Sequence, residues 1–177
     1  GAFERSRNIE AIIFDKTGTL TQGKFGVTDA MSFDKLVSKE DILAFAAAVE
    51  VHSEHPIAKA IVAAASNKKI VTGFKSIPGK GAQGEVDGKI VAVVSPGYLR
   101  ENKIQVPSQQ VEIDKLSTQG KTVIYVLFDN KLVGAVALAD IIRPESKAAI
   151  AELQSQGIKC MMLTGDNKLV AKWVAEE

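Results

Sequence analysis

Two short apolar runs, one near each end of the chain, constrain the fold most. IIF at 12–14 and CMML at 160–163 are consecutive apolar residues, as is typical of parallel strands covered on both faces. A polar, glycine-containing segment follows each run, DKTGT after the first and TGD after the second. We therefore expect buried strands over 9–15 and 158–164 that belong to one α/β domain.

The chain between these runs has a different pattern. β-branched segments at 70–77, 81–86 and 89–94 are separated by glycine-rich turns, and Asp87-Gly88 is a strong hairpin signal. A second hairpin is expected over 121–140, with its turn at Asp129-Asn130. Little periodicity marks 21–34, which we interpret as connecting structure. Helical spacing and capping residues predict helices over 40–49, 56–66, 96–102, 107–118, 144–156 and 167–176.

This change of pattern predicts an insertion. We assign 1–24 and 138–177 to two segments of the α/β domain. We assign 25–137 to an inserted α+β domain built on an antiparallel sheet.

Composition excludes several classes of protein. The 177 residues are 46% hydrophobic and carry a net charge of +1, so we expect neither nucleic acid nor an anionic membrane as a partner. The single cysteine, Cys160, precludes an internal disulfide and fits a reducing compartment. No apolar run approaches the ~18 residues of a membrane span. We therefore expect this chain to be soluble and to make no direct membrane contact.

The two strand ends carry the candidate chemistry. Asp15 ends the first strand, and Thr164-Gly165-Asp166 ends the other. Carboxyl ends of strands in an open α/β sheet meet at one edge, where ligands bind. Hydroxyls and glycine N–H groups suit phosphate, and a carboxylate can attack a phosphoryl group. Alternatively, Asp15 is a turn residue and Thr164 a helix cap.

The motif DKTGTLT, 15–21, resembles the phosphorylation motif of P-type ATPases, cation pumps of the haloacid dehalogenase superfamily. TGD at 164–166 and DIIRP at 140–144 resemble two further motifs of that family, in the expected order. The resemblance implies a haloacid-dehalogenase-like phosphorylation (P) domain, incomplete at its C-terminus, with an inserted nucleotide-binding (N) domain.

By that resemblance, Asp15 attacks the γ-phosphate of ATP and becomes aspartyl-phosphate. Asp15 and the backbone carbonyl of Thr17 would ligate Mg²⁺, and Asp140 and Arg143 would form the hinge between domains. The phosphate-binding residues would be Lys16, Thr17, Gly18, Thr164, Gly165 and Asp166.

Ser-Glu-His-Pro at 53–56 resembles the nucleotide-site motif of heavy-metal-transporting P-type ATPases, and PGKGAQG at 78–84 resembles the Gly-x-Gly element of that site. The implied nucleotide-binding residues are Glu50, His55, Gly79 and Gly81. Ser95-Pro96-Gly97 stands where many family members have Gly-Asn. Copper is the first expectation for the transported ion, and zinc, cadmium and cobalt stay open.

Two alternatives stay open beside the pump. Phosphatases of the superfamily usually carry a second Asp two residues after the nucleophile, where this chain has Thr17. The chain could also be a nucleotide-binding module that is inactive as a fragment. For the pump, the expected partners are ATP or ADP and the pump's own transmembrane and actuator domains, with this chain as a cytoplasmic domain of an integral membrane protein. Family members continue with a lysine and another Mg²⁺-binding motif, so we expect weak activity from this chain alone.

Overall fold

A computed structural model describes residues 9–106, 110–165 and 168–176. The chain forms two compact units, and each is described by itself. Unit 1 comprises Gly1–Lys24 and Asp140–Glu177, and unit 2 comprises Phe25–Ala139. The second boundary lies after residue 139, two residues beyond the predicted boundary and within the strand β7, Lys131–Ile142.

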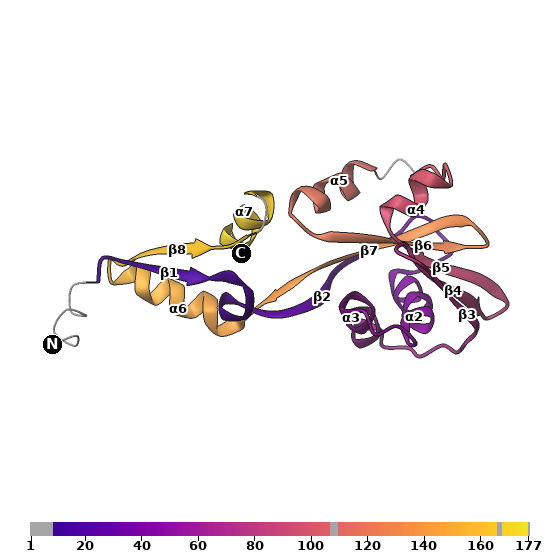
Figure 1. The fold of residues 1–177 in the computed structure, drawn as a ribbon, viewed down its shortest axis with the longest axis horizontal. Coiled ribbons are helices and arrows are strands. Elements are labelled where there is room, and N and C mark those ends of the chain that lie inside the picture. The colour runs from indigo at the N-terminus through magenta and orange to yellow at the C-terminus, as the bar shows by residue number, and fades with distance from the viewer. Residues whose placement is uncertain (1–8, 107–109, 166–167, 177) are drawn as a thin grey trace. The chain divides into compact units, whose positions relative to one another are not determined.

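Unit 2 is built on a six-stranded sheet of order β2-β7-β6-β5-β4-β3, in which β2 is Thr21–Ser32 (Figure 1). The two predicted hairpins are confirmed, with Val86 opposite Lys89 and Phe128 opposite Lys131. Asp129 and Asn130 both have positive φ, 47° and 64°, a conformation that these side chains tolerate better than most. The strands that follow β2 are β3 (Val71–Ile77), β4 (Gly81–Val86), β5 (Lys89–Val94), β6 (Thr122–Phe128) and β7.

The prediction of connecting structure over 21–34 is wrong, because Thr21–Ser32 forms β2 at the edge of the sheet. The Phe33 N–H donates to the Val133 carbonyl at 2.9 Å, and the Thr28 hydroxyl donates to the Ala137 carbonyl at 3.3 Å. These contacts run in opposite order along the two segments, so β2 is antiparallel to β7. The strand is stabilised by a partner more than a hundred positions away, which local periodicity does not reveal.

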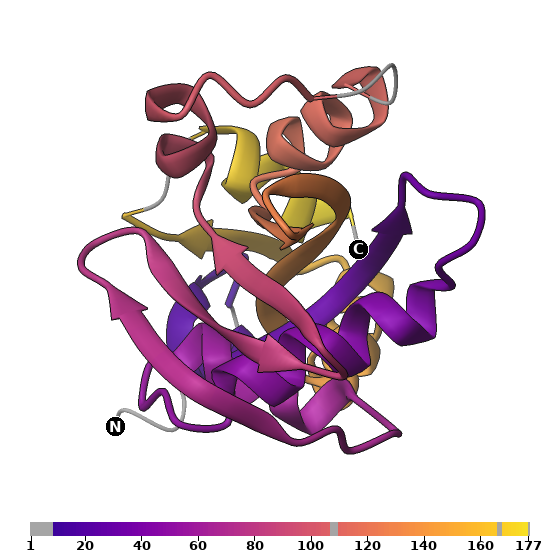
Figure 2. The ribbon, with the colours of Figure 1, turned by 90° about the vertical axis from the view of Figure 1, so that its right-hand side faces the viewer.

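Helices cover both faces of this sheet. Figures 1 and 2 place α2 (Lys39–Glu50) and α3 (Pro56–Ala64) on one side and α4 (Pro96–Glu101) and α5 (Gln110–Thr118) on the other. Alternate residues of β5 belong to different cores. Val91 and Val93 pack in the core under α2 and α3, whereas Ala92 and Val94 pack in the core under α4 and α5. Residues 107–109, the first three of the helix predicted over 107–118, lie outside the described residues.

Unit 1 contains a parallel pair of strands, β1 (Ala11–Asp15) and β8 (Lys159–Leu163). The helix α6 (Pro144–Ser155) precedes β8, and α7 (Lys168–Glu176) follows it. Both predicted strands are confirmed, but burial on both faces is wrong, since Ile13 is 63% and Leu163 is 64% exposed. Ile12 and Met162, on the opposite face, are half-buried.

None of the helices that the structure describes combines the length and the apolar composition that a membrane span requires.

Candidate functional site

Asp15 lies at the carboxyl edge of the β1–β8 pair. It is the last residue of β1, and its register partner is Leu163, the last residue of the parallel strand β8. Thr164 and Gly165 therefore follow at the same edge, as the order of parallel strands requires. Asp15 and Gly165 are exposed and Thr164 is half-buried. The predicted phosphate ligand Asp166 lies outside the described residues.

The segment Lys16–Leu20 makes one tight turn directly after Asp15. Gly18 has φ +80°, a left-handed conformation that glycine adopts without steric cost, and a Cβ added there would meet no heavy atom within 4 Å. The turn closes where the Thr21 N–H donates to the Lys16 carbonyl. Open space and exposed backbone beside a carboxylate are suited to a phosphoryl group.

A carboxylate braces both ends of this turn. The fully buried Thr21 hydroxyl donates to Asp140 Oδ2 at 2.6 Å, and the Lys24 N–H donates to Asp140 Oδ1 at 3.1 Å. Lys16 Nζ lies 3.9 Å from the same carboxylate, and the Lys16 side chain is only 7% exposed. Lys16 thus turns its charge toward Asp140, inside unit 1.

Arg143 completes the brace. Its Nε donates to the Thr21 carbonyl at 3.1 Å, and its Nη2 donates to the Gly18 carbonyl at 3.2 Å. Its backbone N–H donates to the Leu20 carbonyl at 3.0 Å. Asp140 and Arg143 therefore hold the turn that follows Asp15, and their role as hinge residues stays a prediction. Sequence reasoning gave Thr21 no role, and only its place in the seven-residue motif marked it.

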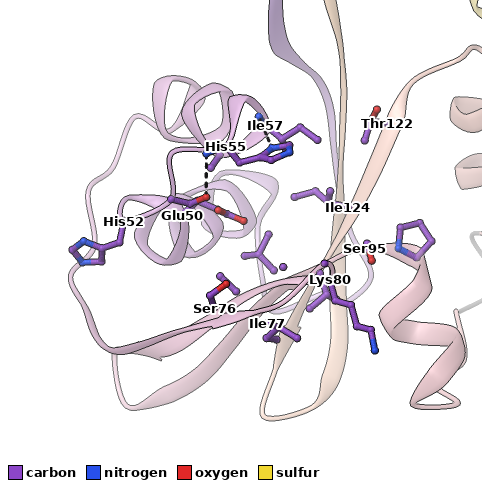
Figure 3. A pocket seen from close by; sticks show the side chains of 18 of the residues that line it. Glu50, His52, His55, Ile57, Ser76, Ile77, Lys80, Ser95, Thr122 and Ile124 are labelled. Atoms are coloured by element: carbon purple, nitrogen blue, oxygen red, sulfur yellow. Dashed lines mark hydrogen bonds between the residues drawn. The ribbon is translucent and has the colours of Figure 1, made fainter. Parts of the chain in front are cut away.

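Unit 2 contains a cavity of about 530 Å³ between α2, α3 and the sheet (Figure 3). This volume lies in the usual range for small-molecule sites, and the apolar share of its lining is typical of them. Apolar lining comes from Ile57, Ala58, Phe74, Ile77, Ala82, Val93, Val94, Pro96, Val123 and Ile124. Polar lining comes from Glu50, His52, Ser53, His55, Ser76, Lys80, Ser95 and Thr122, beside glycines 79 and 81.

His55 is the N-cap of α3 as well as a lining residue. Its Nδ1 accepts a hydrogen bond from the Ile57 N–H at 3.2 Å, and Pro56 occupies the first helical position (Figure 3). Because Nδ1 is the acceptor, the neutral ring carries its proton on Nε2. The helix cap therefore leaves an N–H on the other side of the ring as the hydrogen-bond donor.

Glu50 is the last residue of α2 and is only 8% exposed. Burial raises the pKa of its carboxyl above the ordinary value of 4.5, and a hydrogen bond with Ser53 partly opposes that rise. A buried carboxyl in a mostly apolar cavity is an energetic cost that a hydrogen-bond donor on a ligand would offset.

Glycine suits the two positions of the Gly-x-Gly element for different structural reasons. Gly79 has φ +70° in a turn closed by the Lys80 N–H and the Ile77 carbonyl, with open space around it. Gly81 has φ +140°, and a Cβ there would lie 2.0 Å from the Val93 carbonyl oxygen. Close approach of β5 thus requires glycine at position 81, whether or not a ligand also comes near.

Sequence reasoning missed much of this lining, including Phe74, Lys80 and Thr122. Lys80 had one visible signal, its place between the two glycines, whereas the others reach the cavity only through the packing of the sheet. Of the segment Ser95-Pro96-Gly97, Ser95 and Pro96 line the cavity, and Gly97 lies within α4.

The fit to magnesium follows from the chemistry of the donors. Within residues 9–106, 110–165 and 168–176, no group of three or more His, Cys, Asp or Glu side chains could hold a metal ion. Mg²⁺ is commonly bound by one or two carboxylates together with substrate phosphates and waters. The Asp15 carboxylate and the Thr17 carbonyl fit that pattern once a phosphate supplies the remaining oxygens.

Comparison with known proteins agrees with these features. Residues 9–177 match the family model of haloacid dehalogenase-like hydrolases. The chain is 53% identical to copper-exporting P-type ATPase B of Archaeoglobus fulgidus and 36% identical to the copper-exporting P-type ATPase of Bacillus subtilis. These alignments cover 99% and 98% of this chain but 25% and 22% of the relatives. The chain thus spans about a quarter of the length of the curated relatives that it matches.

Solved structures give the same picture. A zinc-transporting PIB-type ATPase has a TM-score of 0.86 at 33% identity, over 99% of this chain and 29% of that one. The N-domain of HMA8, a copper-transporting P-type ATPase, has a TM-score of 0.55 at 33% identity, over 64% of this chain and 99% of that one. The chain belongs to the haloacid dehalogenase-like hydrolases, and over nearly its whole length it is similar to the catalytic region of heavy-metal P-type ATPases.

Proposed function

We propose that this chain is the ATP-binding and phosphorylation region of a heavy-metal P-type ATPase, in which Asp15 accepts the γ-phosphate of ATP. The observation that carries the proposal is the register of the β1–β8 pair, which brings Asp15 and Thr164-Gly165 to one edge. Unit 2 supplies the nucleotide through its separate cavity. In this proposal unit 1 is the P domain and unit 2 is the N domain.

In unit 2, the adenine ring occupies the apolar part of the cavity. The Glu50 carboxylate accepts a hydrogen bond from the adenine amino group, which offsets the cost of burying that carboxylate. The His55 ring packs on the base or donates to it from Nε2. Gly79, which has open space around it, allows the backbone to come close to the ligand.

In unit 1, an Asp15 carboxylate oxygen forms a bond to the γ-phosphorus as the bond to the β–γ bridging oxygen breaks, so ADP leaves. Asp15 becomes aspartyl-phosphate, a covalent intermediate of the kind that carboxylate nucleophiles form. The Thr17 and Thr164 hydroxyls and the Gly18 and Gly165 N–H groups bind the phosphate oxygens. Asp15 and the Thr17 carbonyl would hold a Mg²⁺ ion, which would supply positive charge to neutralise the transferred group.

The residue at position 17 favours a pump over a phosphatase. A carboxylate at that place could protonate the leaving group and then activate water, whereas a threonine hydroxyl provides no comparable acid or base. The acyl-phosphate therefore persists longer. A pump uses that time to change conformation before the phosphate is lost.

For the whole protein we propose transport of heavy-metal ions, with copper as the first candidate. Its support is the similarity to proteins named as copper-exporting or copper-transporting P-type ATPases, two of them at 53% and 42% identity. Similar proteins are also named for silver, manganese and zinc transport. The transmembrane and actuator domains of the pump are then its partners.

The test is phosphorylation of the full-length protein with γ-labelled ATP. The wild type is expected to form an acid-stable, hydroxylamine-labile label, and Asp15→Asn is expected to form none. Asp87→Asn makes the same chemical change in a hairpin turn of unit 2, where asparagine tolerates the positive φ, and should keep the label. A label that persists in Asp15→Asn would overturn the proposal.

A further inference from the structure

We propose that Lys80 binds the phosphates of the nucleotide and that Glu101 on α4 competes for the Lys80 ammonium. This inference rests on the proposed function, because it names how the same cavity distinguishes a nucleotide from a nucleoside. Lys80 is the middle residue of the Gly-x-Gly element, of which only the glycines were predicted to bind nucleotide, and Glu101 lies outside every predicted motif.

The first argument is charge. ADP and ATP carry several negative charges, and a cation near the phosphates stabilises them through charge-assisted hydrogen bonds. Among the described residues that line the cavity, Lys80 is the only lysine or arginine, whereas Glu50 adds a buried carboxyl. Without Lys80 this lining would favour the base and repel the phosphates.

The second argument is position. Lys80 lies at the opposite end of the cavity from Glu50 and His55, beside Ser95 (Figure 3). A base held at Glu50 and His55 can extend its phosphates across the cavity toward Lys80. The Lys80 backbone is fixed on both sides, since its N–H donates to the Ile77 carbonyl at 2.9 Å and its carbonyl accepts from the Ser95 N–H at 2.8 Å.

The third argument is the state of the side chain. The Lys80 ammonium pairs with the Glu101 carboxylate, and the two side chains are 34% and 60% exposed. An exposed pair of this kind contributes little to stability, because both groups are readily solvated. A phosphate offers a charge-assisted hydrogen bond as the Glu101 carboxylate does, so the flexible lysine can exchange one anion for the other.

Two consequences follow. Lys80 contributes to affinity only when the ligand has phosphates, and Glu101 lowers that contribution by competition. The cavity is thereby selective for nucleoside di- and triphosphates over the nucleoside.

The experiment is calorimetric titration of the 177-residue chain with adenosine, ADP and ATP. Lys80→Gln should weaken the binding of ADP and of ATP by about tenfold, the effect of one charge-assisted hydrogen bond. The binding of adenosine should stay unchanged. Glu101→Gln should tighten the binding of ADP by about twofold, since this substitution removes an exposed charge that competes for Lys80. Lys75→Gln is the matched control: Lys75 is exposed on β3, outside the cavity lining, and its loss should change none of the affinities.

Each other outcome is decisive. Equal weakening of adenosine and ADP by Lys80→Gln would assign Lys80 to the structure of the cavity and overturn the inference. Unchanged ADP binding would overturn it as well, and ADP binding unchanged or weakened by Glu101→Gln would overturn the competition. Failure of the wild type to bind any of the three ligands would instead refute the proposed nucleotide cavity itself.

Discussion

His55→Ala removes two contacts of different kinds, and the structure allows each to be measured by itself. Nδ1 caps α3 by accepting from the Ile57 N–H at 3.2 Å. The rest of the ring lines the cavity proposed for adenine. His55→Ser is the matched variant, because serine is a good N-cap but has no ring.

The two contacts have different magnitudes. Loss of an N-cap costs about 1 kcal/mol of unfolding free energy, so His55→Ala should be less stable than the wild type by that amount. His55→Ser should recover most of it. Loss of the ring removes an aromatic contact and a hydrogen bond with the base, together about 1–2 kcal/mol of binding free energy. Both variants should therefore bind ADP about 5- to 30-fold more weakly.

Two assays separate these effects. Both tyrosines, Tyr98 and Tyr125, lie in unit 2, so tyrosine fluorescence during urea unfolding reports the stability of the unit that contains His55. Calorimetric titration with ADP reports binding. The two contacts are distinguished because loss of the helix cap should lower stability, whereas loss of the ring should lower the affinity for ADP.

The reasoning would be refuted by either of two results. Wild-type affinity in His55→Ser would show that the ring serves only as a helix cap. Wild-type stability in His55→Ala would show that the Nδ1 contact does not stabilise α3, and the assignment of the proton to Nε2 would then have no support.

Two further predictions concern groups that the fold buries. Thr21→Val loses the 2.6 Å hydrogen bond to Asp140 and should lower the unfolding free energy of unit 1 by about 1–3 kcal/mol. Trp173, the single tryptophan, lies in unit 1, so its fluorescence during unfolding measures this change. A decrease in unfolding free energy of less than about 0.5 kcal/mol would contradict the role of Asp140 in stabilising the turn. For Glu50, burial raises the folded-state pKa above 4.5, so between the two pKa values the folded state holds a proton that the unfolded state has lost. The wild type should therefore lose stability relative to Glu50→Gln as the pH rises from 4.5 through the folded-state pKa, and parallel pH profiles of the two proteins would disprove this cause.

Short-range patterns predicted most of the fold. The hairpin turns at Asp87-Gly88 and Asp129-Asn130 are set by residues that tolerate positive φ, and α2 begins at a Ser38–Asp41 capping box. These signals depend on neighbours in the chain, so they survive in any tertiary context. β2 left no such signal, because an edge strand with a half-exposed pattern depends on the partner strand.

The candidate site divides in the same way. The sequence by itself determined that a carboxylate ends an apolar strand, that a flexible glycine turn follows it, and that His55 precedes a proline at a helix start. Only the tertiary structure decided that Asp140 and Arg143 hold the turn beside Asp15, that Glu50 is buried with a raised pKa, and that Lys80 faces Glu101. The physical reason is that backbone preference is local, whereas desolvation and hydrogen bonds between Thr21 and a residue 119 positions away exist only after distant segments have packed together.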